Sequence, residues 1–279
     1  MSNRRFVNFH KVNLSLPYLQ STFSGIVVGS GEELLICFHG FGESALHFSC
    51  IEPALGNIFT IVALDMPFHG NTVWQENRDF SKDDLEALAG KILERFGKQR
   101  FSLLGYSMGG RLALCLVERM ASRISHLILV APDGLKNNPW HMIATQTRIG
   151  NRVFSYNTRH PELFFRLLTL WRRWGLLNES VYKFAFHSMD KLDKRQLVYN
   201  VWTNMRRMMP SKQKCKRLLA QYNIDTVMFF GRFDRVIPPV FGARFADGSF
   251  PCKLVVLEKG HQLLSEELGF IISQNIRSK

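Results

Sequence analysis

The chain has 279 residues, 46% of them hydrophobic and 21% charged, with a formal net charge of +13 at pH 7. These proportions predict a globular protein with a sizeable core and exclude a disordered or collagen-like chain. No run of about 18 apolar residues is present, which excludes a predicted membrane span. The five cysteines are odd in number, widely spaced and without a zinc-site pattern, so we expect reduced thiols and no bound metal.

The N-terminal half alternates predicted strands and helices. Its first residues lack the apolar run of a secretory signal, so we expect a cytoplasmic protein. Residues 6–16 and 22–29 alternate apolar and polar side chains, which predicts two strands that form a hairpin at a sheet edge. The continuous apolar runs 34–38 and 59–65 predict strands that are covered on both faces. Between them, we expect a helix over 44–55 that is capped by its first residue, a serine.

A second helix and a tight turn follow. Ser81-Lys82-Asp83-Asp84 is typical of a capping box and predicts an amphipathic helix to about residue 96. The apolar run 101–104 then enters a Gly-x-Ser-x-Gly sequence centred on Ser107, which leads into a helical pattern. So tight a strand-to-helix turn leaves no room beside the serine, which explains Gly105 and Gly109. We therefore expect the hydroxyl of Ser107 at the tip of the turn, with the backbone N–H of Met108 pointing into the same space.

The pattern changes after the next predicted strand, residues 126–130. From 135 to about 216 the chain shows helical periodicity and no convincing strand. Strands resume at 226–230 and 253–257, each followed by a helical segment. This order predicts a mostly parallel, doubly wound α/β sheet with an all-helical insertion after strand six.

Two parts of unequal charge result from this division. We expect a core of residues 1–134 and 218–279, and a helical lid of residues 135–217 over the carboxyl edge of the sheet. Residues 136–217 carry 17 Lys and Arg against four acids, whereas the remainder carries 19 of each. Three interpretations explain a strongly basic lid: an anionic substrate, an acidic carrier protein, or peripheral contact with an anionic membrane surface. A nucleic-acid partner is not expected, because nothing else in the chain resembles a nucleic-acid module.

A serine nucleophile needs a base, and the base needs an orienting acid. His261 follows the last predicted strand, at the same sheet edge as Ser107. His39 and His69 lie in turns at that edge and are rivals, although both are expected to tie loops together.

Three aspartates compete for the role of the acid. Asp234 lies just past the seventh predicted strand and is the preferred candidate. Asp133 after strand six competes with it, and Asp65 is a weaker candidate.

Taken together, these segments resemble the α/β-hydrolase family. The chain order Ser107, Asp234, His261 matches the family's Ser…Asp…His order. His39-Gly40-Phe41-Gly42 is similar to the family's oxyanion loop, and Asp65–Thr72 resembles its D-x-P-G-x-G-x-S turn, with Phe68 for glycine and Thr72 for serine. The segments Gly231–Pro238 and Gly260-His261 match the acid and base segments. The resemblance covers residues 7–134 and 218–279.

The resemblance implies a reaction mechanism. Ser107 would attack an acyl carbonyl while His261 takes its proton and Asp234 orients the imidazole. The backbone N–H groups of Phe41 and Met108 would bind the oxyanion. No cofactor or metal is implied, and a serine at 107 argues against the displacement chemistry of the dehalogenases that share this fold.

Substrate recognition is expected at five residues: His39, Gly40, Tyr106, Arg111 and Trp171. Residues 105–111 are similar to the turn of a menaquinone-pathway lyase of this fold, in which Arg111 would be the matching arginine. Carrier-protein methyl esterases of biotin synthesis also resemble the chain, in fold and in having a basic lid. Trp171 lies on an apolar stripe of the lid that more often serves packing than ligand binding.

The sequence therefore predicts a serine hydrolase that cleaves a carboxylic ester or thioester whose acyl group carries, or is attached to, negative charge. A cofactor-free lyase acting on a polycarboxylate is the alternative within enzymes. A non-catalytic binding protein on the hydrolase fold is the alternative outside them.

Overall fold

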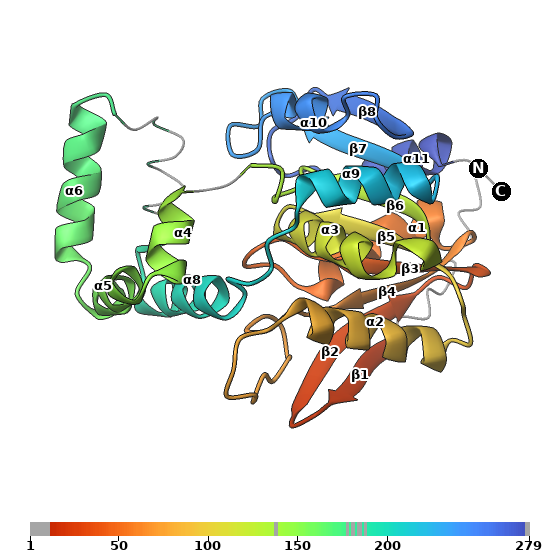
Figure 1. The fold of residues 1–279 in the computed structure, drawn as a ribbon, viewed down its shortest axis with the longest axis horizontal. Helices are drawn as coiled ribbons and strands as arrows, with labels where there is room; N and C mark the ends of the chain where they lie inside the picture. The colour runs from red at the N-terminus through yellow and green to blue at the C-terminus, as the bar shows by residue number, and fades with distance from the viewer. Residues whose placement is uncertain are drawn as a thin grey trace, which may run out of the picture.

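The computed structural model describes residues 12–136, 139–176, 179, 182, 186 and 189–276. At its centre is an eight-stranded sheet in the order β1-β2-β4-β3-β5-β6-β7-β8 (Figure 1). The strands are β1 (Val12–Tyr18), β2 (Ser21–Val28), β3 (Glu33–Phe38), β4 (Phe59–Leu64), β5 (Phe101–Tyr106), β6 (Ile124–Val130), β7 (Asp225–Gly231) and β8 (Cys252–Leu257). β2 pairs antiparallel with β1 and β4, and every other pairing is parallel. The predicted edge hairpin and mostly parallel sheet are confirmed, although residues 6–11 of the first predicted strand lie outside the described residues.

Both faces of the sheet are covered. Alternate residues of β3 belong to two different core clusters: Leu34, Ile36 and Phe38 to one, Leu35 and Cys37 to the other. The first cluster includes residues of α2 (Lys82–Arg95), α3 (Met108–Met120), α9 (Lys212–Gln221) and α10 (Pro239–Phe245). The second includes residues of the 3₁₀ helix η1 (Ala45–Ile51), α1 (Glu52–Leu55) and α11 (Glu266–Asn275). A strand buried on both faces needs apolar side chains in both directions, which explains the continuous apolar runs.

Two helix starts differ in how they are capped. At α2 the predicted capping box is present: Ser81 Oγ accepts from Asp84 N at 3.3 Å, and Asp84 Oδ2 accepts from Ser81 N at 2.8 Å. The cap predicted at Ser44 is wrong, because its side chain makes no cap hydrogen bond. The N–H of Ala45 donates instead to Asp65 Oδ1 at 2.7 Å, so a carboxylate from the end of β4 replaces the serine.

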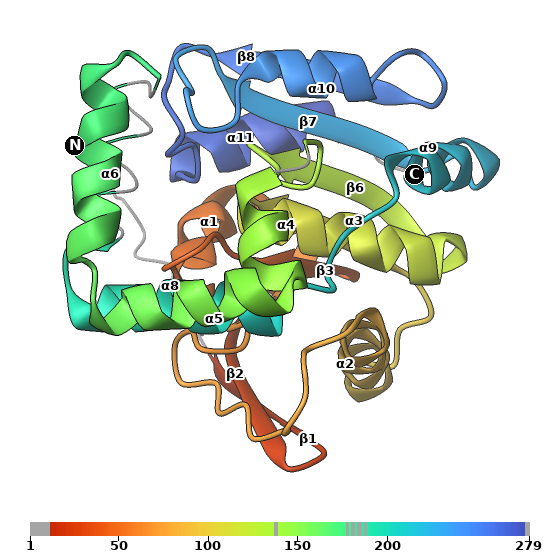
Figure 2. The same ribbon diagram turned by 60° about the vertical axis from the view of Figure 1, so that its left-hand side comes forward.

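Between β6 and β7, the described part of the chain forms α9 and four helices that precede it: α4 (Pro139–Gln146), α5 (Arg148–Arg159), α6 (Glu162–Arg173) and α8 (Leu192–Asn204). In both views α5 and α8 run side by side, and in Figure 1 α6 stands apart from the sheet (Figures 1 and 2). His141 of α4 and Trp202 of α8 share a small cavity with Asp133, just after β6. These helices therefore meet the core at the carboxyl end of β6. Residues 137–138 and most of 177–188 lie outside the described residues.

The lid boundary predicted at residue 217 falls inside α9, which packs on α3. The thiol of Cys215 donates to Leu114 O at 3.4 Å, and Leu219 is fully buried in the core. We therefore place the boundary before Lys212 and call residues 135–211 the helical insert. Since α9 carries four of the 17 basic residues, the helical insert retains 13 against four acids, a net charge of +9.

No helix in the described part of the chain has the length and apolar composition of a membrane span. All five cysteines are free thiols, as expected.

Candidate active site

The turn between β5 and α3 projects Ser107 from the sheet edge. Its backbone has φ 51° and ψ −116°, a strained conformation for a residue with a side chain. A Cβ on Gly105 would lie 2.5 Å from Gly109 O, and one on Gly109 would lie 1.9 Å from Phe38 O. Only glycine fits at either position, so the helix can start directly against β3 and β5. The serine is half-buried at the tip, as the motif predicts.

Three side chains from three strand ends form a continuous chain of contacts. Ser107 Oγ lies 3.0 Å from His261 Nε2, and His261 Nδ1 lies 2.8 Å from Asp234 Oδ2. Asp234 is only 3% exposed, and its Oδ1 accepts from the N–H groups of Val236 at 2.8 Å and Ile237 at 2.9 Å. A carboxylate held in this way keeps the proton on Nδ1 and leaves the Nε2 lone pair facing the serine hydroxyl.

The competing acids are engaged elsewhere. Asp133 Oδ1 accepts from Gly134 N at 2.7 Å, and its Oδ2 faces Arg111 Nε at 3.5 Å. Asp65 accepts from Ser24 Oγ at 2.6 Å, in addition to its bond from Ala45. Of the three aspartates, Asp234 is the one in contact with His261.

The two rival histidines hold the loop that precedes η1. His39 Nε2 accepts from Met66 N at 3.0 Å, while its Nδ1 lies 2.7 Å from Gly40 O. His69 Nε2 accepts from Gly42 N at 3.1 Å, and the two rings are 4.8 Å apart. Burial lowers the pKa of His39 to about 3 and lowers the pKa of His69 below its usual value. The expectation that His39 binds substrate is not met, because its ring is fully buried and both nitrogens contact backbone groups, those of Met66 and Gly40.

The loop of residues 39–42 lies directly against the serine. A Cβ on Gly40 would be 3.3 Å from Ser107 Cβ, so the backbone at Gly40 passes close to the candidate nucleophile. Phe41 is the next residue of this loop after Gly40. Met108 is the first residue of α3, so its N–H has no acceptor within the helix. Both candidate oxyanion donors therefore belong to segments that border Ser107.

Glu43 is a neighbour of the site that the sequence analysis missed. Its Oε2 lies 3.2 Å from the Cβ position of Gly40 and 3.5 Å from His47 Nδ1, and no hydrogen bond reaches this buried oxygen within the described residues. Burial raises the pKa of the Glu43 carboxyl, which opposes its ionisation beside the serine. Its position in the sequence could have indicated this role, because Glu43 directly follows residues 39–42, which resemble an oxyanion loop.

The structure gives two further residues that were expected to contact the substrate, Tyr106 and Trp171, different surroundings. Tyr106 is 2% exposed, donates its hydroxyl to His261 O at 3.2 Å and stacks on the imidazole with 5.9 Å between ring centroids. It therefore supports the loop of His261 instead of facing a substrate, and burial raises the pKa of its hydroxyl. Trp171 lies on α6, the helix that stands apart from the sheet in Figure 1.

Arg111 borders a small cavity one helical turn beyond Ser107. The cavity has a volume of about 90 Å³, and Lys136 and Trp202 also line it. Arg111 is 7% exposed, its Nε makes no hydrogen bond within the described residues, and this nitrogen lies 3.5 Å from Asp133 Oδ2. A buried guanidinium nitrogen without a hydrogen bond favours a bound anion, and the cavity has room for a group of carboxylate size.

Comparison with known proteins places the chain among hydrolases. A family model described as alpha/beta hydrolase fold matches residues 33–267. The uncharacterized hydrolase YugF of Bacillus subtilis is 24% identical over 248 residues, which are 88% of this chain and 89% of YugF. The pimeloyl-[acyl-carrier protein] methyl ester esterase of Klebsiella pneumoniae is 26% identical over 215 residues, which are 76% of this chain and 79% of the esterase.

Solved structures share the fold. The 2-hydroxy-6-oxo-6-phenylhexa-2,4-dienoate hydrolase of Rhodococcus superposes with a TM-score of 0.63 at 19% identity, covering 96% of this chain and 99% of that one. An identity this low shows a common fold only.

Proposed function

Because the chain belongs to the alpha/beta hydrolase fold family and is a hydrolase, we propose that it cleaves a carboxylic ester or thioester with Ser107 as nucleophile. The observation that supports this proposal is the chain of contacts from Ser107 through His261 to Asp234. A serine hydroxyl is a weak nucleophile at neutral pH, and the imidazole of His261, 3.0 Å away, supplies the base that it needs.

The reaction proceeds in two halves. In the first, Ser107 attacks the acyl carbonyl, His261 takes the hydroxyl proton at Nε2 and returns it to the leaving alcohol or thiol. Asp234 keeps the imidazole in the reactive tautomer and stabilises the imidazolium. In the second half, His261 deprotonates a water that attacks the acyl-enzyme and releases the acid.

The oxyanion of each tetrahedral intermediate is bound by backbone donors. The N–H groups of Phe41 and Met108 fill this role in the proposal, because both lie in segments that border Ser107. Loss of one such donor costs about 3 kcal/mol of transition-state stabilisation in this class of reaction.

The substrate carries a negative charge on, or attached to, its acyl group. The cavity at Arg111 suits a carboxylate one helical turn from the nucleophile, and Lys136 adds a second positive charge there. The Klebsiella relative is named for a methyl ester of a carrier-linked acid, so carrier-linked esters belong among the substrates to test.

A substrate screen tests the proposal. Wild-type protein and Ser107→Ala are assayed with p-nitrophenyl esters, acyl-CoA thioesters and carrier-linked acyl esters of equal acyl length, with and without a terminal carboxylate. We expect turnover by the wild type, preference for the carboxylate-bearing esters, and loss of turnover in Ser107→Ala with an unchanged melting temperature. Residual activity of Ser107→Ala within tenfold of the wild type contradicts the assignment of the nucleophile.

Elimination from a polycarboxylate is the second candidate reaction, because the Arg111 cavity would also hold a carboxylate of such a substrate. Oxygen-18 water separates the two reactions. Hydrolysis places solvent oxygen in the acid product, whereas elimination does not.

A further inference from the structure

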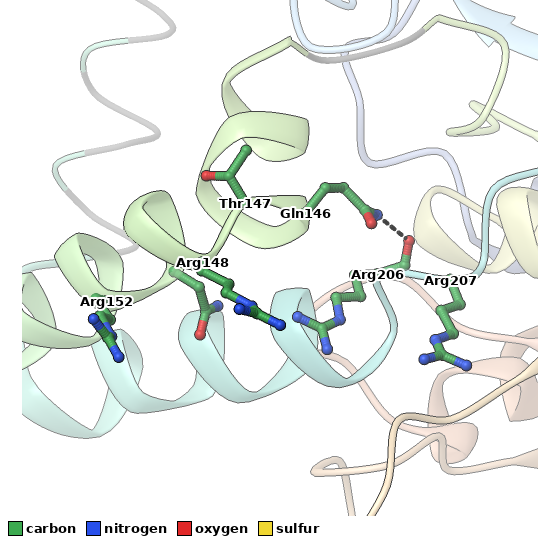
Figure 3. Close-up of a pocket in the computed structure, with 7 residues that line it drawn as sticks. Gln146, Thr147, Arg148, Arg152, Arg206 and Arg207 are labelled. Carbon is green, nitrogen blue, oxygen red and sulfur yellow. Dashed lines mark hydrogen bonds between the residues drawn. The ribbon is translucent and has the colours of Figure 1, made fainter.

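A second pocket, rich in arginine, lies in the helical insert between the α4–α5 turn and the end of α8. It is open and has a volume of about 490 Å³. Four arginines line it, Arg148 and Arg152 from α5 and Arg206 and Arg207 from the segment after α8. Figure 3 shows the side chains of Arg148 and Arg206 directed toward the same space below Gln146.

The walls of this pocket are held by hydrogen bonds. Gln146 Nε2 donates to Arg206 O at 2.7 Å (Figure 3), and the Arg206 guanidinium donates to Thr145 O at 3.0 Å. On the other side, Asn151 Nδ2 donates to Thr203 Oγ1 at 3.0 Å and joins α5 to α8. The four arginines are therefore presented by a fixed framework instead of by separate loops.

The positive charge of the pocket is poorly balanced. Arg206 and Arg207 share one carboxylate, Asp79, at 2.8 and 3.3 Å. Arg148 and Arg152 have no acidic partner within 4.0 Å in the described part of the chain. Four arginines thus line the pocket with one carboxylate, that of Asp79, paired to two of them, and an anion in the pocket would relieve the repulsion between the guanidinium groups.

Large apolar side chains project from α5 beside these arginines. Ile149 is 77% exposed, Val153 53% and Tyr156 62%, and their spacing of four and three residues places them on one face of the helix. Arg148 and Arg152 are exposed in the row of α5 next to that of Ile149 and Val153. Arginines that flank exposed aliphatic and tyrosine side chains on a helix are typical of a surface that rests in the headgroup region of a bilayer.

We propose that the arginine pocket binds the phosphate group of an anionic phospholipid and that the exposed face of α5 dips into the headgroup region of the same membrane. Guanidinium groups match phosphate oxygens in a bidentate manner, which fits the convergence of Arg148 and Arg206. An acidic protein surface would neutralise the arginines, but it would leave Ile149 and Val153 without an apolar partner. The proposal goes beyond the proposed function and does not depend on the serine.

Vesicle binding tests the proposal without any substrate. The full chain is mixed with phosphatidylcholine vesicles with and without about one third phosphatidylglycerol, and binding is measured by co-sedimentation. We expect binding only to the anionic vesicles. Arg148→Gln with Arg152→Gln should weaken partitioning about 30-fold, at about 1 kcal/mol for each arginine near the surface and 1.4 kcal/mol for each tenfold change.

A matched control separates a site from a general effect of charge. Lys91→Gln with Arg95→Gln removes an equally spaced pair of charges from α2, in the core, and should leave partitioning within about twofold of wild type. Val153→Ser should weaken binding more than Val240→Ser, a change at a similarly exposed valine of α10. The melting temperature of each variant shows that it is folded.

Several results would overturn the proposal. If the protein bound neutral and anionic vesicles equally, an anion site would be excluded. If the Arg148 and Arg152 substitutions and the Lys91 and Arg95 control substitutions weakened vesicle binding equally, this pocket would be excluded. Absence of vesicle binding, together with calorimetric binding of inorganic phosphate that the Arg148 and Arg152 changes abolish, would assign the pocket to a soluble phosphate compound instead.

Discussion

At the scale of single residues, the site depends on which carboxylate faces His261. Asp234 and Asp133 both follow parallel strands and lie at the same sheet edge, so strand order alone does not separate them. Their hydrogen bonds do: Asp234 is almost fully buried against His261, whereas Asp133 is half-exposed and faces Arg111.

This difference predicts the outcome of two isosteric substitutions. Asp234→Asn should lower kcat/KM by about 10⁴, because an amide favours the wrong tautomer of His261. Asp133→Asn should change it by less than tenfold for a neutral ester. Both variants are assayed side by side with a p-nitrophenyl ester, and circular dichroism checks their folding. The opposite ranking would move the acid to the end of β6.

At the scale of elements, the loop after β3 is organised by two neutral histidines. Each ring accepts one backbone N–H, from Met66 or Gly42, through the nitrogen that protonation would block. Burial lowers both pKa values, and that of His39 falls to about 3. The loop that carries Phe41 therefore depends on both rings remaining uncharged.

The lowered pKa values of His39 and His69 determine how the stability of the fold changes with pH. A histidine whose pKa is lower in the folded state than its usual value of about 6.5 stabilises the fold fully above that pH. This stability is lost as the pH falls from about 6.5 toward 3, because the unfolded chain takes up the proton first. We expect the melting temperature to fall over this range, with the His39 ring still neutral at pH 5 by nitrogen NMR. A His39 ring that titrates near pH 6.5 in the folded protein would contradict this account.

At the scale of the whole molecule, charge is distributed unevenly between the two parts. The helical insert carries a net +9 and α9 a further +4, while the rest of the core is neutral. The insert meets the core at the Arg111 cavity, so the field there is positive.

An anionic substrate should respond to this field. We expect kcat/KM for an anionic ester to fall as salt rises, because the Debye length shortens from about 10 Å at 0.1 M to about 3 Å at 1 M. A neutral ester of equal acyl length is the control and should change little. Lys136→Gln, which removes a charge beside Arg111, should reproduce part of the high-salt behaviour. If both esters respond alike, the positive insert does not select the substrate.

Much of the fold was predictable from local patterns. Apolar runs of strand length, the capping box at Ser81 and the glycines around Ser107 each act within a few residues, so the sequence shows them directly. The order of serine, aspartate and histidine along the chain then identified the fold, because parallel strands bring their carboxyl ends to one edge. The uneven charge was also visible in the sequence alone.

Contacts between distant residues were decided by the tertiary structure. Packing against α3 placed α9 with the core, although its helical pattern continues that of the insert. His39 and His69 accept hydrogen bonds from Met66 and Gly42 and thereby support the loop. The chain direction after β6 places Asp133 against Arg111 instead of His261. The direction of a side chain at a strand end depends on the neighbours that pack around it, and those neighbours come from other parts of the chain.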